Sequence, residues 1–345
     1  MNAESPQRDV SGLISIVAPA YNEEGGLDQF TNRVDTVMRS NRLAYEIVFV
    51  NDGSTDRTLS VMQALRATNP NITIVNLSRN FGKETAMTAG IAHAVGEAVL
   101  IIDTDLQDPP EIIPEMIDGW RAGYDVVYAQ RTERAGETWL KNATARWFYW
   151  TVKRMGPVPI PENTGDFRLI SRRAAQALLQ LPEHHRFMKG LYAWIGFRQK
   201  AIPYSRHARF AGQSKWNYWQ LWNLALEGIT SFTIIPLKLA TYLGFAIAMT
   251  AFAYGLVMIF KVIFFGEAVR GFPTLLSVML LLGGVQLIVL GFIGEYLGRI
   301  FDETKRRPLY LLESVSWSEA AERLNKAPED KAAARVVGGR WSRKL

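Results

Sequence analysis

Two aspartates, Asp103 and Asp105, stand directly after an apolar run at residues 98–102. Such a run predicts a buried strand, and the carboxyl ends of strands are where open α/β sheets bind ligands. Carboxylate oxygens suit Mg²⁺ or Mn²⁺, which usually bind through one or two carboxylates together with substrate phosphates. An Asp-x-Asp pair also occurs in ordinary solvated turns and helix caps, so the metal interpretation depends on what the neighbouring segments carry.

Polar and acidic residues also follow the first two predicted strands. The first strand leads into Pro-Ala-Tyr-Asn-Glu-Glu at 19–24, and the second into Asn-Asp-Gly-Ser-Thr-Asp at 51–56. Because parallel strands end at one edge of their sheet, three acid-bearing strand ends converge there. A nucleotide base over the first two, bound by Asp52, would place its diphosphate at a metal on Asp103 and Asp105. Taken alone, the second segment is equally consistent with a plain turn before a capped helix.

The first two-thirds of the chain alternates apolar runs with helical patterns. Strands alternating with helices of this kind predict a parallel, doubly wound α/β sheet, which would position the acids. The predicted strands are residues 13–18, 46–50, 72–77, 98–102 and 125–129, and the predicted helices are residues 24–39, 56–67, 83–95 and 110–122.

Composition narrows the kinds of site that the chain can hold. It has 345 residues, no cysteine and a formal net charge of +6. Disulfides, thiolate metal sites and cysteine nucleophiles are therefore excluded, and the positive charge fits phosphate-bearing ligands or an anionic membrane face. The first dozen residues are polar and lack the apolar segment of a signal peptide. The histidines lack the paired spacing of a zinc site.

Two long apolar stretches towards the C-terminal end predict a pair of transmembrane helices. Residues 239–265 and 272–297 each exceed the roughly 20 residues that a bilayer requires, and each carries a single charge near its end. Lys238 and the basic residues between 299 and 307 flank the pair, so the positive-inside rule places both flanks and the large domain in the cytoplasm. The alternative is a buried helical hairpin within a soluble core.

An aromatic segment precedes the first of these stretches. Trp216, Tyr218, Trp219 and Trp222 recur at helical spacing with polar residues between them. Tryptophan and tyrosine prefer the headgroup level, which predicts an amphipathic helix in the membrane interface, although an ordinary core helix has the same spacing. The expected organisation is a polar arm at 1–11, a cytoplasmic domain at 12–212, the interfacial helix at 213–232, two transmembrane helices at 233–300 and a charged cytoplasmic tail at 301–345, with a short helix at 316–324.

Four strings at the predicted strand ends carry a specific resemblance: IVAPAYNEE at 16–24, VNDGSTD at 50–56, RNFGK at 79–83 and DTDLQDP at 103–109. Together they resemble glycosyltransferase family 2. Three further strings, GDFRL at 165–169, RFMKG at 186–190 and RFAGQSKW at 209–216, are similar to the polyprenyl-phosphate glycosyltransferases, relatives of dolichol-phosphate mannose synthase. The two C-terminal spans resemble the bacterial undecaprenyl-phosphate branch. No Gln-x-x-Arg-Trp string occurs, which argues against chain elongation.

The resemblance implies a Rossmann-like glycosyltransferase A fold with a mostly parallel sheet. Asp105, with Gln107 and Asp103 nearby, would bind Mg²⁺ or Mn²⁺ on the diphosphate. Asp166 would face the sugar or the acceptor as the candidate base, which makes Asp105 and Asp166 the candidate catalytic residues. The nucleotide sugar would be held by Pro19, Tyr21, Glu23, Asp52, Lys83 and Asp103. The acceptor phosphate would be held by Arg206, Arg209, Ser214 and Lys215.

The implied reaction is inverting transfer of a single hexose to undecaprenyl phosphate. A phosphate monoester has a second pKa of about 6 and is largely dianionic at neutral pH, so Asp166 either acts as a base or only orients hydroxyls. UDP-glucose is the favoured donor, while GDP-mannose, a UDP-N-acetylhexosamine and a UDP-aminoarabinose derivative stay open. A non-catalytic membrane protein that binds a nucleotide sugar or a lipid-linked sugar is the alternative from another class.

The expected partners are the donor, the polyprenyl phosphate and the membrane, without nucleic acid. Glycines within the apolar stretches would allow close packing of helices, and a homo-oligomer, specifically a tetramer, is compatible with the resemblance. The expected location is the bacterial inner (plasma) membrane, with the catalytic domain and both termini in the cytoplasm.

Overall fold

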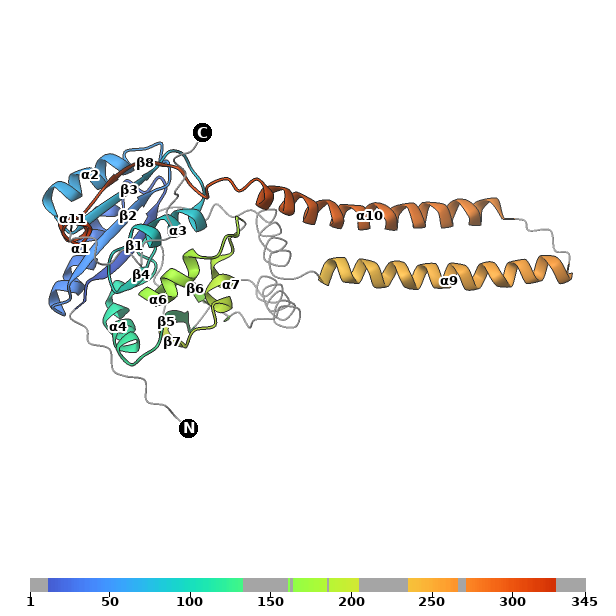
Figure 1. The fold of residues 1–345 in the computed structure, drawn as a ribbon, viewed down its shortest axis with the longest axis horizontal. Coiled ribbons are helices and arrows are strands. Elements are labelled where there is room, and N and C mark those ends of the chain that lie inside the picture. Colours follow the sequence, from blue (N-terminus) through green and yellow to red (C-terminus); the bar gives the residue numbers. More distant parts are fainter. Residues whose placement is uncertain are drawn as a thin grey trace, which may run out of the picture. The chain divides into compact units, whose positions relative to one another are not determined.

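The computed structural model describes residues 12–132, 161, 164–184, 186–204, 235–265 and 271–326. The chain divides into two compact units. The first contains the described residues up to 204 together with those from 308 onward, and the second contains the described residues from 235 to 307. Figure 1 labels the helices and strands of both units.

An eight-stranded sheet forms the centre of the first unit, in the order β7-β5-β6-β4-β1-β2-β3-β8. β1 pairs in parallel with β2 and β4, β2 with β3, and β5 with β7, whereas β6 and β8 are antiparallel to their neighbours. The predicted, mostly parallel α/β sheet is therefore confirmed. The strands are β1 Ile14–Ala20, β2 Tyr45–Asn51, β3 Ile72–Leu77, β4 Ala98–Ile101, β5 Val126–Arg131, β6 Thr164–Ser171, β7 Gln199–Tyr204 and β8 Leu312–Ser316.

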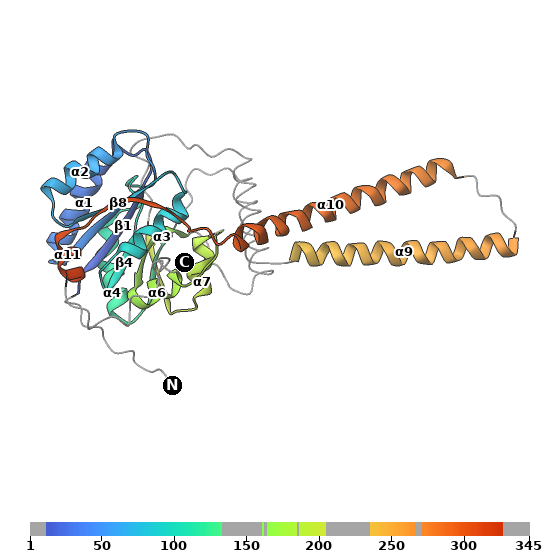
Figure 2. The ribbon, with the colours of Figure 1, turned by 45° about the horizontal axis from the view of Figure 1, so that its top comes forward.

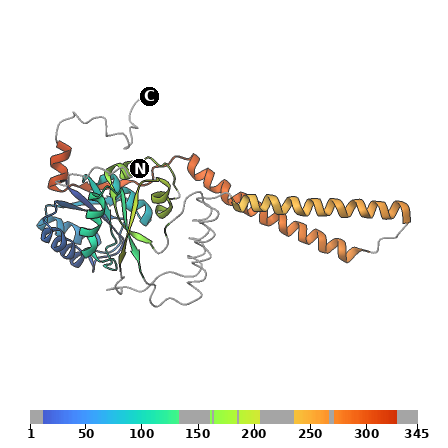
Figure 3. The ribbon, with the colours of Figure 1, turned by 90° about the horizontal axis from the view of Figure 1, so that it is seen from below.

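Helices lie on both sides of the strands (Figures 2 and 3), because successive apolar side chains of each strand point to opposite faces. Ile14 and Ile16 share a core cluster with Phe30 of α1. Val17 faces α3 instead, where a Cβ added to Gly90 would lie 2.3 Å from the Val17 side chain. The helices of this unit are α1 Leu27–Ser40, α2 Thr58–Thr68, α3 Lys83–His93, the 3₁₀ turn η1 Pro110–Ile112, α4 Ile113–Arg121, α6 Arg172–Leu179, α7 Met188–Trp194 and α11 Glu319–Lys326.

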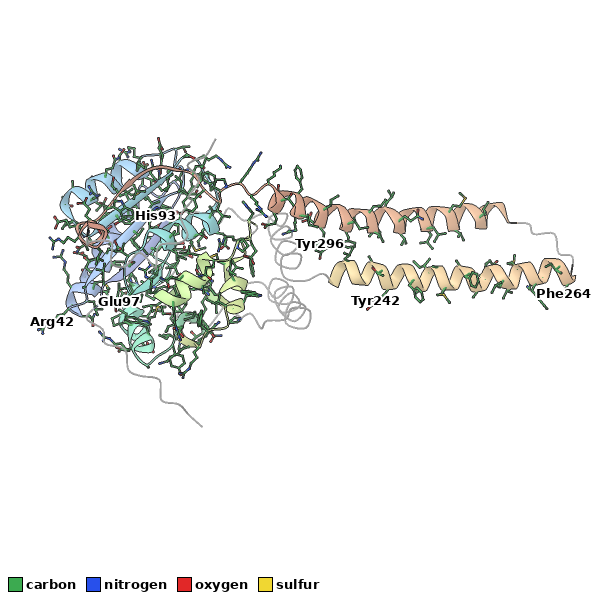
Figure 4. The ribbon with its side chains drawn as sticks, in the orientation of Figure 1. Arg42, His93, Glu97, Tyr242, Phe264 and Tyr296 are labelled. Atoms are coloured by element: carbon green, nitrogen blue, oxygen red, sulfur yellow. The ribbon has the colours of Figure 1, made fainter. Side chains whose placement is uncertain are left out.

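The segment after residue 308 completes one edge of this sheet. β8 pairs antiparallel with β3, and α11 begins where Ser318 Oγ accepts a hydrogen bond from Ala321 N at 3.1 Å. The Trp317 ring packs 5.6 Å, centroid to centroid, from the ring of His93, which Figure 4 labels at the end of α3. The sequence predicts only a short helix in this region, and β8 is additional. Its mixed composition does not indicate a strand, and its hydrogen bonds to β3 stabilise the extended backbone.

Two long helices form the second unit: α9, Ile235–Phe265, and α10, Phe272–Thr304. They contact each other, and the windows Ala240–Met258 and Leu281–Thr304 are long and apolar enough to cross a membrane. Neither window is buried, and apolar side chains project outward from both helices (Figure 4), unlike the buried hairpin of a soluble core. These helices correspond to the two predicted spans. The predicted interfacial helix at 213–232 lies outside the described residues.

Candidate active site

Three loops meet at the carboxyl edge of β1, β2 and β3, and Asp52 ties two of them together. Its two carboxylate oxygens accept hydrogen bonds from Phe81 N at 2.7 Å and from Gly82 N at 3.0 Å. Burial raises the pKa of Asp52, although these two N–H groups oppose the rise. The expected nucleotide ligand Asp52 is thus 3% exposed and held by backbone. A base N–H could use only the remaining lone pairs of its oxygens.

The loop after β2 is pressed against the loop after β3 at Gly53. Its φ is +64°, and a Cβ at this position would lie 2.3 Å from the carbonyl carbon of Arg79 and 2.4 Å from Asn80 N. Only glycine combines a left-handed backbone with so close an approach. The loop after β1 joins from the other side, since Asn22 Oδ1 accepts a hydrogen bond from Thr55 N at 2.8 Å.

Three of the predicted nucleotide-binding residues lie in or beside the loop after β1. Pro19 is a buried residue within β1, in register with Val50 of β2. Tyr21 is 45% exposed on the loop, where a planar base could stack on its ring. The backbone N–H of Glu23 donates to Thr58 Oγ1 at 2.9 Å, which anchors the loop to the first residue of α2.

Lys83, the first residue of α3, joins two acids from different strands. Its ammonium lies 2.7 Å from Asp103 Oδ2, beyond the end of β4, and 2.8 Å from Asp166 Oδ2 in β6. Burial disfavours the ammonium, but the two carboxylate charges outweigh it and raise the pKa of Lys83. The same cation holds the pKa of Asp166 well below its usual range against the effect of burial, with further help from Lys189. Asp103, Lys83 and Asp166 therefore form one charged group, called the lysine bridge below.

A layer of ionisable side chains lies behind the lysine bridge. The Arg168 guanidinium stacks 3.8 Å over the Tyr192 ring and donates to the Gly165 carbonyl at 2.7 Å. Glu84 accepts a hydrogen bond from Met188 N at 3.2 Å, and burial, reinforced by the charge of Asp166, raises the pKa of Glu84 to about 8. This layer holds β6, α3 and α7 in place behind the reacting edge. Arg168 comes from the sequence string at 165–169, and Met188 from the string at 186–190.

The two carboxylate oxygens of Asp166 differ in their partners. Its Oδ1 is buried and has no hydrogen-bond partner within the part of the chain that the structure describes, whereas Oδ2 binds Lys83. A buried carboxylate oxygen without a donor is costly, so a substrate hydroxyl in this position would be favoured.

The predicted metal ligands occupy a tight turn after β4. Asp105 Oδ1 accepts a hydrogen bond from Gln107 N at 3.1 Å, and Leu106 between them has a φ of 56°. Asp103 is engaged by Lys83, and within the described residues no three His, Cys, Asp or Glu side chains gather as a metal cluster. The donor set nevertheless fits Mg²⁺ or Mn²⁺, because such ions are often held by one or two carboxylates and completed by phosphate oxygens.

Arg131 is a further candidate site residue, which the sequence analysis does not name. Its Nε donates to Tyr204 Oη at 3.2 Å, and Tyr204 Oη donates to Asp108 Oδ1. A Cβ on Gly165 would lie 3.3 Å from Arg131 Nη2, which places this cation beside the residue of β6 that precedes Asp166. Arg131 ends β5 on the same edge of the sheet as the acids, and this position in the sequence could have indicated it as a candidate. The predicted acceptor residues Arg206, Arg209, Ser214 and Lys215 lie outside the described residues.

Comparison with known proteins identifies the family of the chain. Residues 15–179 match the family described as Glycosyl transferase family 2, and residues 235–300 match the GtrB C-terminal hairpin. An uncharacterised glycosyltransferase of Synechocystis sp. is 54% identical over 88% of this chain and 95% of its own length. The prophage bactoprenol glucosyl transferase homologue of Escherichia coli K12 is 47% identical over 88% and 99%, respectively. The bactoprenol glucosyl transferase of Shigella phage SfX is 48% identical over 87% and 99%.

These relatives align with 87–88% of the chain. The first matched region covers almost all of the α/β domain from β1 to α6, and the second covers most of the apolar hairpin. The expected resemblance is confirmed: the chain belongs to glycosyltransferase family 2 and is a glycosyltransferase with a C-terminal hairpin of the GtrB type.

Proposed function

We propose that this enzyme transfers one glucose from UDP-glucose to undecaprenyl phosphate, with inversion at the anomeric carbon. Two relatives, each aligned over 99% of its own length, are named for glucosyl transfer involving bactoprenol. The hairpin of this chain suits an enzyme whose acceptor stays in a bilayer. The single observation that carries the proposal is the lysine bridge, in which Lys83 connects Asp103, after β4, with Asp166 on β6.

The donor would lie along the carboxyl edge of the sheet. The loops after β1 and β2 would hold the uridine, with Tyr21 and Asp52 nearest the base. Asp105, with Gln107 and Asp103, would hold Mg²⁺ or Mn²⁺, and the ion when bound neutralises the charge of the leaving diphosphate. Lys83 would add a second positive charge beside the sugar phosphate. Arg131, at the end of β5, is placed to add a third on the same edge.

The chemical step needs little proton transfer. An oxygen of the acceptor phosphate attacks the anomeric carbon, the bond from that carbon to the diphosphate oxygen breaks, and UDP leaves with the bonding electrons. The acceptor is already largely dianionic, with a second pKa of about 6. Lys83 lowers the pKa of Asp166, which makes this carboxylate a weak base. We therefore assign Asp166 to orienting a sugar hydroxyl through Oδ1, rather than to removing a proton.

The acceptor phosphate and the diphosphate repel each other, so cations are needed on the acceptor side. Arg206, Arg209, Ser214 and Lys215 remain our proposal for that role, because arginine gives bidentate phosphate contacts and lysine a compact charge. They precede the aromatic segment that we propose to lie in the membrane interface, which would bring them to the headgroup level.

A donor panel tests the reaction. Detergent-solubilised full-length enzyme would be incubated with undecaprenyl phosphate, Mg²⁺ or Mn²⁺, and UDP-glucose, GDP-mannose, UDP-N-acetylglucosamine or a UDP-aminoarabinose derivative. We expect UDP release and a glucosylated lipid by mass spectrometry, with β-configured product from the α-linked donor. A different donor giving the only product would replace glucose in the proposal. Binding of a nucleotide sugar without turnover of any donor would favour a non-catalytic binding protein.

We also propose that the protein resides in a bacterial plasma membrane, with the catalytic domain and both termini in the cytoplasm. Arg299 and the basic residues 305–307 follow the second span, and the connector at 266–271 is nearly neutral. Because the chain has no cysteine, a single Glu267→Cys variant would report the connector without background. A membrane-impermeant thiol reagent should label Glu267→Cys on intact spheroplasts and label Glu319→Cys only after lysis. The reverse pattern would invert the topology.

A further inference from the structure

The strand that follows the membrane hairpin adds a side chain to the support of the donor loops. α10 ends at Thr304, and the chain returns to the sheet at β8, which pairs with β3. β3 is itself next to β2, whose end carries Asn51 and Asp52. β8 thus lies one strand away from the loop that we propose for uridine.

A β-bulge aims Glu313 at β3. The register pairs Asn76 with Ser314 and Leu77 with Leu312, so Glu313 is the extra residue of β8. In regular antiparallel pairing Glu313 would stand opposite Leu77, whose buried side chain alternates in direction with that of Asn76. A bulge re-aims a side chain in this way, and bulges occur often beside active sites.

Glu313 begins a continuous chain of hydrogen bonds that ends in the donor loop. Asn76 Nδ2 donates to Glu313 Oε2 at 2.9 Å, and Asn51 Nδ2 donates to Asn76 Oδ1 at 2.7 Å. Asn51 Oδ1 then accepts from Ser54 N at 3.2 Å, and Ser54 Oγ accepts from Asn22 N at 3.1 Å. The chain therefore crosses β8, β3 and β2 and reaches the loop after β1.

The carboxylate sets the direction of the two bonds between side chains. The backbone N–H groups of Ser54 and Asn22, which can only donate, set the other two. An ionised carboxylate only accepts hydrogen bonds, whereas an amide can present either its oxygen or its NH₂ group. Asn76 must turn its NH₂ group to Glu313 and its oxygen to Asn51. Asn51 must then turn its NH₂ group to Asn76 and its oxygen to Ser54 N. Both amides are almost fully buried, at 4% and 3% exposure, so water cannot readily replace a lost partner.

We propose that Glu313 is a positioning residue for the donor, acting through Asn76 and Asn51 on the loop that holds the nucleotide. This inference rests on the proposed function, because it takes the loop at 51–55 to be the uridine site. The carboxyl-terminal return of the chain is then part of the donor-binding machinery.

The test compares nucleotide binding and kinetics in full-length detergent-solubilised protein. Glu313→Ala removes the acceptor, and Glu313→Gln keeps the shape but lets either end of the amide face Asn76. Glu319→Gln is a matched control on α11, where the carboxylate lies 3.1 Å from the exposed Arg323 guanidinium. One net hydrogen bond corresponds to about a threefold to tenfold change in affinity. We expect Glu313→Ala to raise the Kd for UDP and the KM for UDP-glucose by about this factor with little change in kcat, Glu313→Gln to fall between, and the control to match wild type.

A double variant separates positioning from general damage. Asn76→Ala breaks the same chain, so Glu313→Ala should add almost nothing to it, whereas independent effects would multiply. Wild-type Kd and KM in Glu313→Ala, with normal UDP binding by the wild type, would overturn this inference and leave the proposed function standing. Lowered melting temperature with unchanged Kd would also overturn it, because that result indicates only structural support. Failure of wild-type protein to bind any uridine nucleotide would overturn the proposed function and this inference with it.

Discussion

The ammonium nitrogen of Lys83 lies 2.8 Å from a carboxylate oxygen of Asp166, although α3 and β6 bring these residues from distant parts of the chain. Asp103 lies at 2.7 Å from the same nitrogen. Two carboxylates that share one cation can both stay ionised in a partly buried site, since each opposite charge favours the charged form. The lysine bridge therefore keeps Asp166 anionic and fixed in direction while a donor binds beside it.

Replacing Lys83 by methionine should remove the cation that Asp103 and Asp166 share. Lys83→Met keeps an unbranched side chain one atom shorter but leaves Asp103 and Asp166 to repel each other, so we expect kcat/KM to fall by about a hundredfold or more. The measurement is steady-state UDP release with a circular dichroism spectrum to show that the fold is retained. Lys200→Met on β7, where the ammonium lies 5.8 Å from the centroid of the Tyr124 ring, is the control. Activity within threefold of wild type would remove Lys83 from the mechanism.

Asp105→Asn should uncouple metal binding from nucleotide binding. The amide keeps the turn with Gln107 N but supplies a neutral oxygen to a divalent ion, so we expect turnover to drop by about a hundredfold to a thousandfold. Mn²⁺ electron paramagnetic resonance in the presence of UDP should show a bound ion in wild type and lose it in the variant. Asp118→Asn on α4, whose side chain is 69% exposed, should leave both signals unchanged. An unchanged Mn²⁺ spectrum in Asp105→Asn would contradict the assignment.

The sequence alone indicates most of the sheet and the convergence of the acids, but not what pairs them. β1 to β5 follow from apolar runs, and α9 and α10 follow from their length. The apolar pattern does not predict β6, because Asp166 and Arg168 interrupt it. Lys83 of α3 pairs with Asp166, and Arg168 stacks on Tyr192 of α7. Hydrophobic periodicity does not show contacts between distant segments that stabilise charged residues within a strand.

The same limit applies within the site. The acidic residue Asp52 could be placed at a strand end from sequence, yet its capture by Phe81 N and Gly82 N depends on how two loops pack. Glu313 sits in a segment that reads as a charged tail, and only the bulge in β8 turns it towards Asn76. Short polar edge strands take their structure from the strand that they join.

Gly53→Ala should damage the donor loops more than any other glycine substitution near them. The residue has a positive φ, and the new Cβ would collide with the backbone at Arg79 and Asn80, so we expect a loss of about 2 kcal/mol or more in stability. UDP binding should weaken as well, because the loops after β2 and β3 must separate. Gly25→Ala is the control, since no atom lies within 4 Å of its added Cβ. Chemical denaturation and calorimetric UDP binding would check both, and equal behaviour of the two variants would contradict the close packing.

Removal of the returning segment should unfold the first unit rather than merely shorten it. Ser318 Oγ donates to the buried carboxylate of Glu46 at 3.0 Å, and Arg66 Nη2 donates to the Trp317 carbonyl at 2.7 Å. A chain ending at Arg307 loses these bonds and exposes the edge of β3, which favours aggregation. A chain ending at Lys326 keeps β8 and α11 and is the matched control. Size-exclusion profiles should show a monodisperse control and an aggregated shorter chain; two identical profiles would show that β8 is dispensable.

Glu84 should make stability fall as the pH rises. Burial, with the Asp166 charge next in effect, raises the pKa of Glu84 to about 8, against a usual value of 4.5 in the unfolded chain. Between these values the folded state binds more protons than the unfolded state, so the free energy of unfolding decreases with increasing pH until Glu84 is ionised in both. Glu84→Gln cannot ionise, and its melting temperature should therefore fall by several degrees less than that of wild type between pH 5 and pH 9. Glu115→Gln on the surface of α4 controls for the loss of one charge. If the melting temperatures of wild type and Glu84→Gln changed equally between pH 5 and pH 9, Glu84 would already be ionised at neutral pH in the folded protein. The layer behind the lysine bridge would then contain a buried negative charge at Glu84.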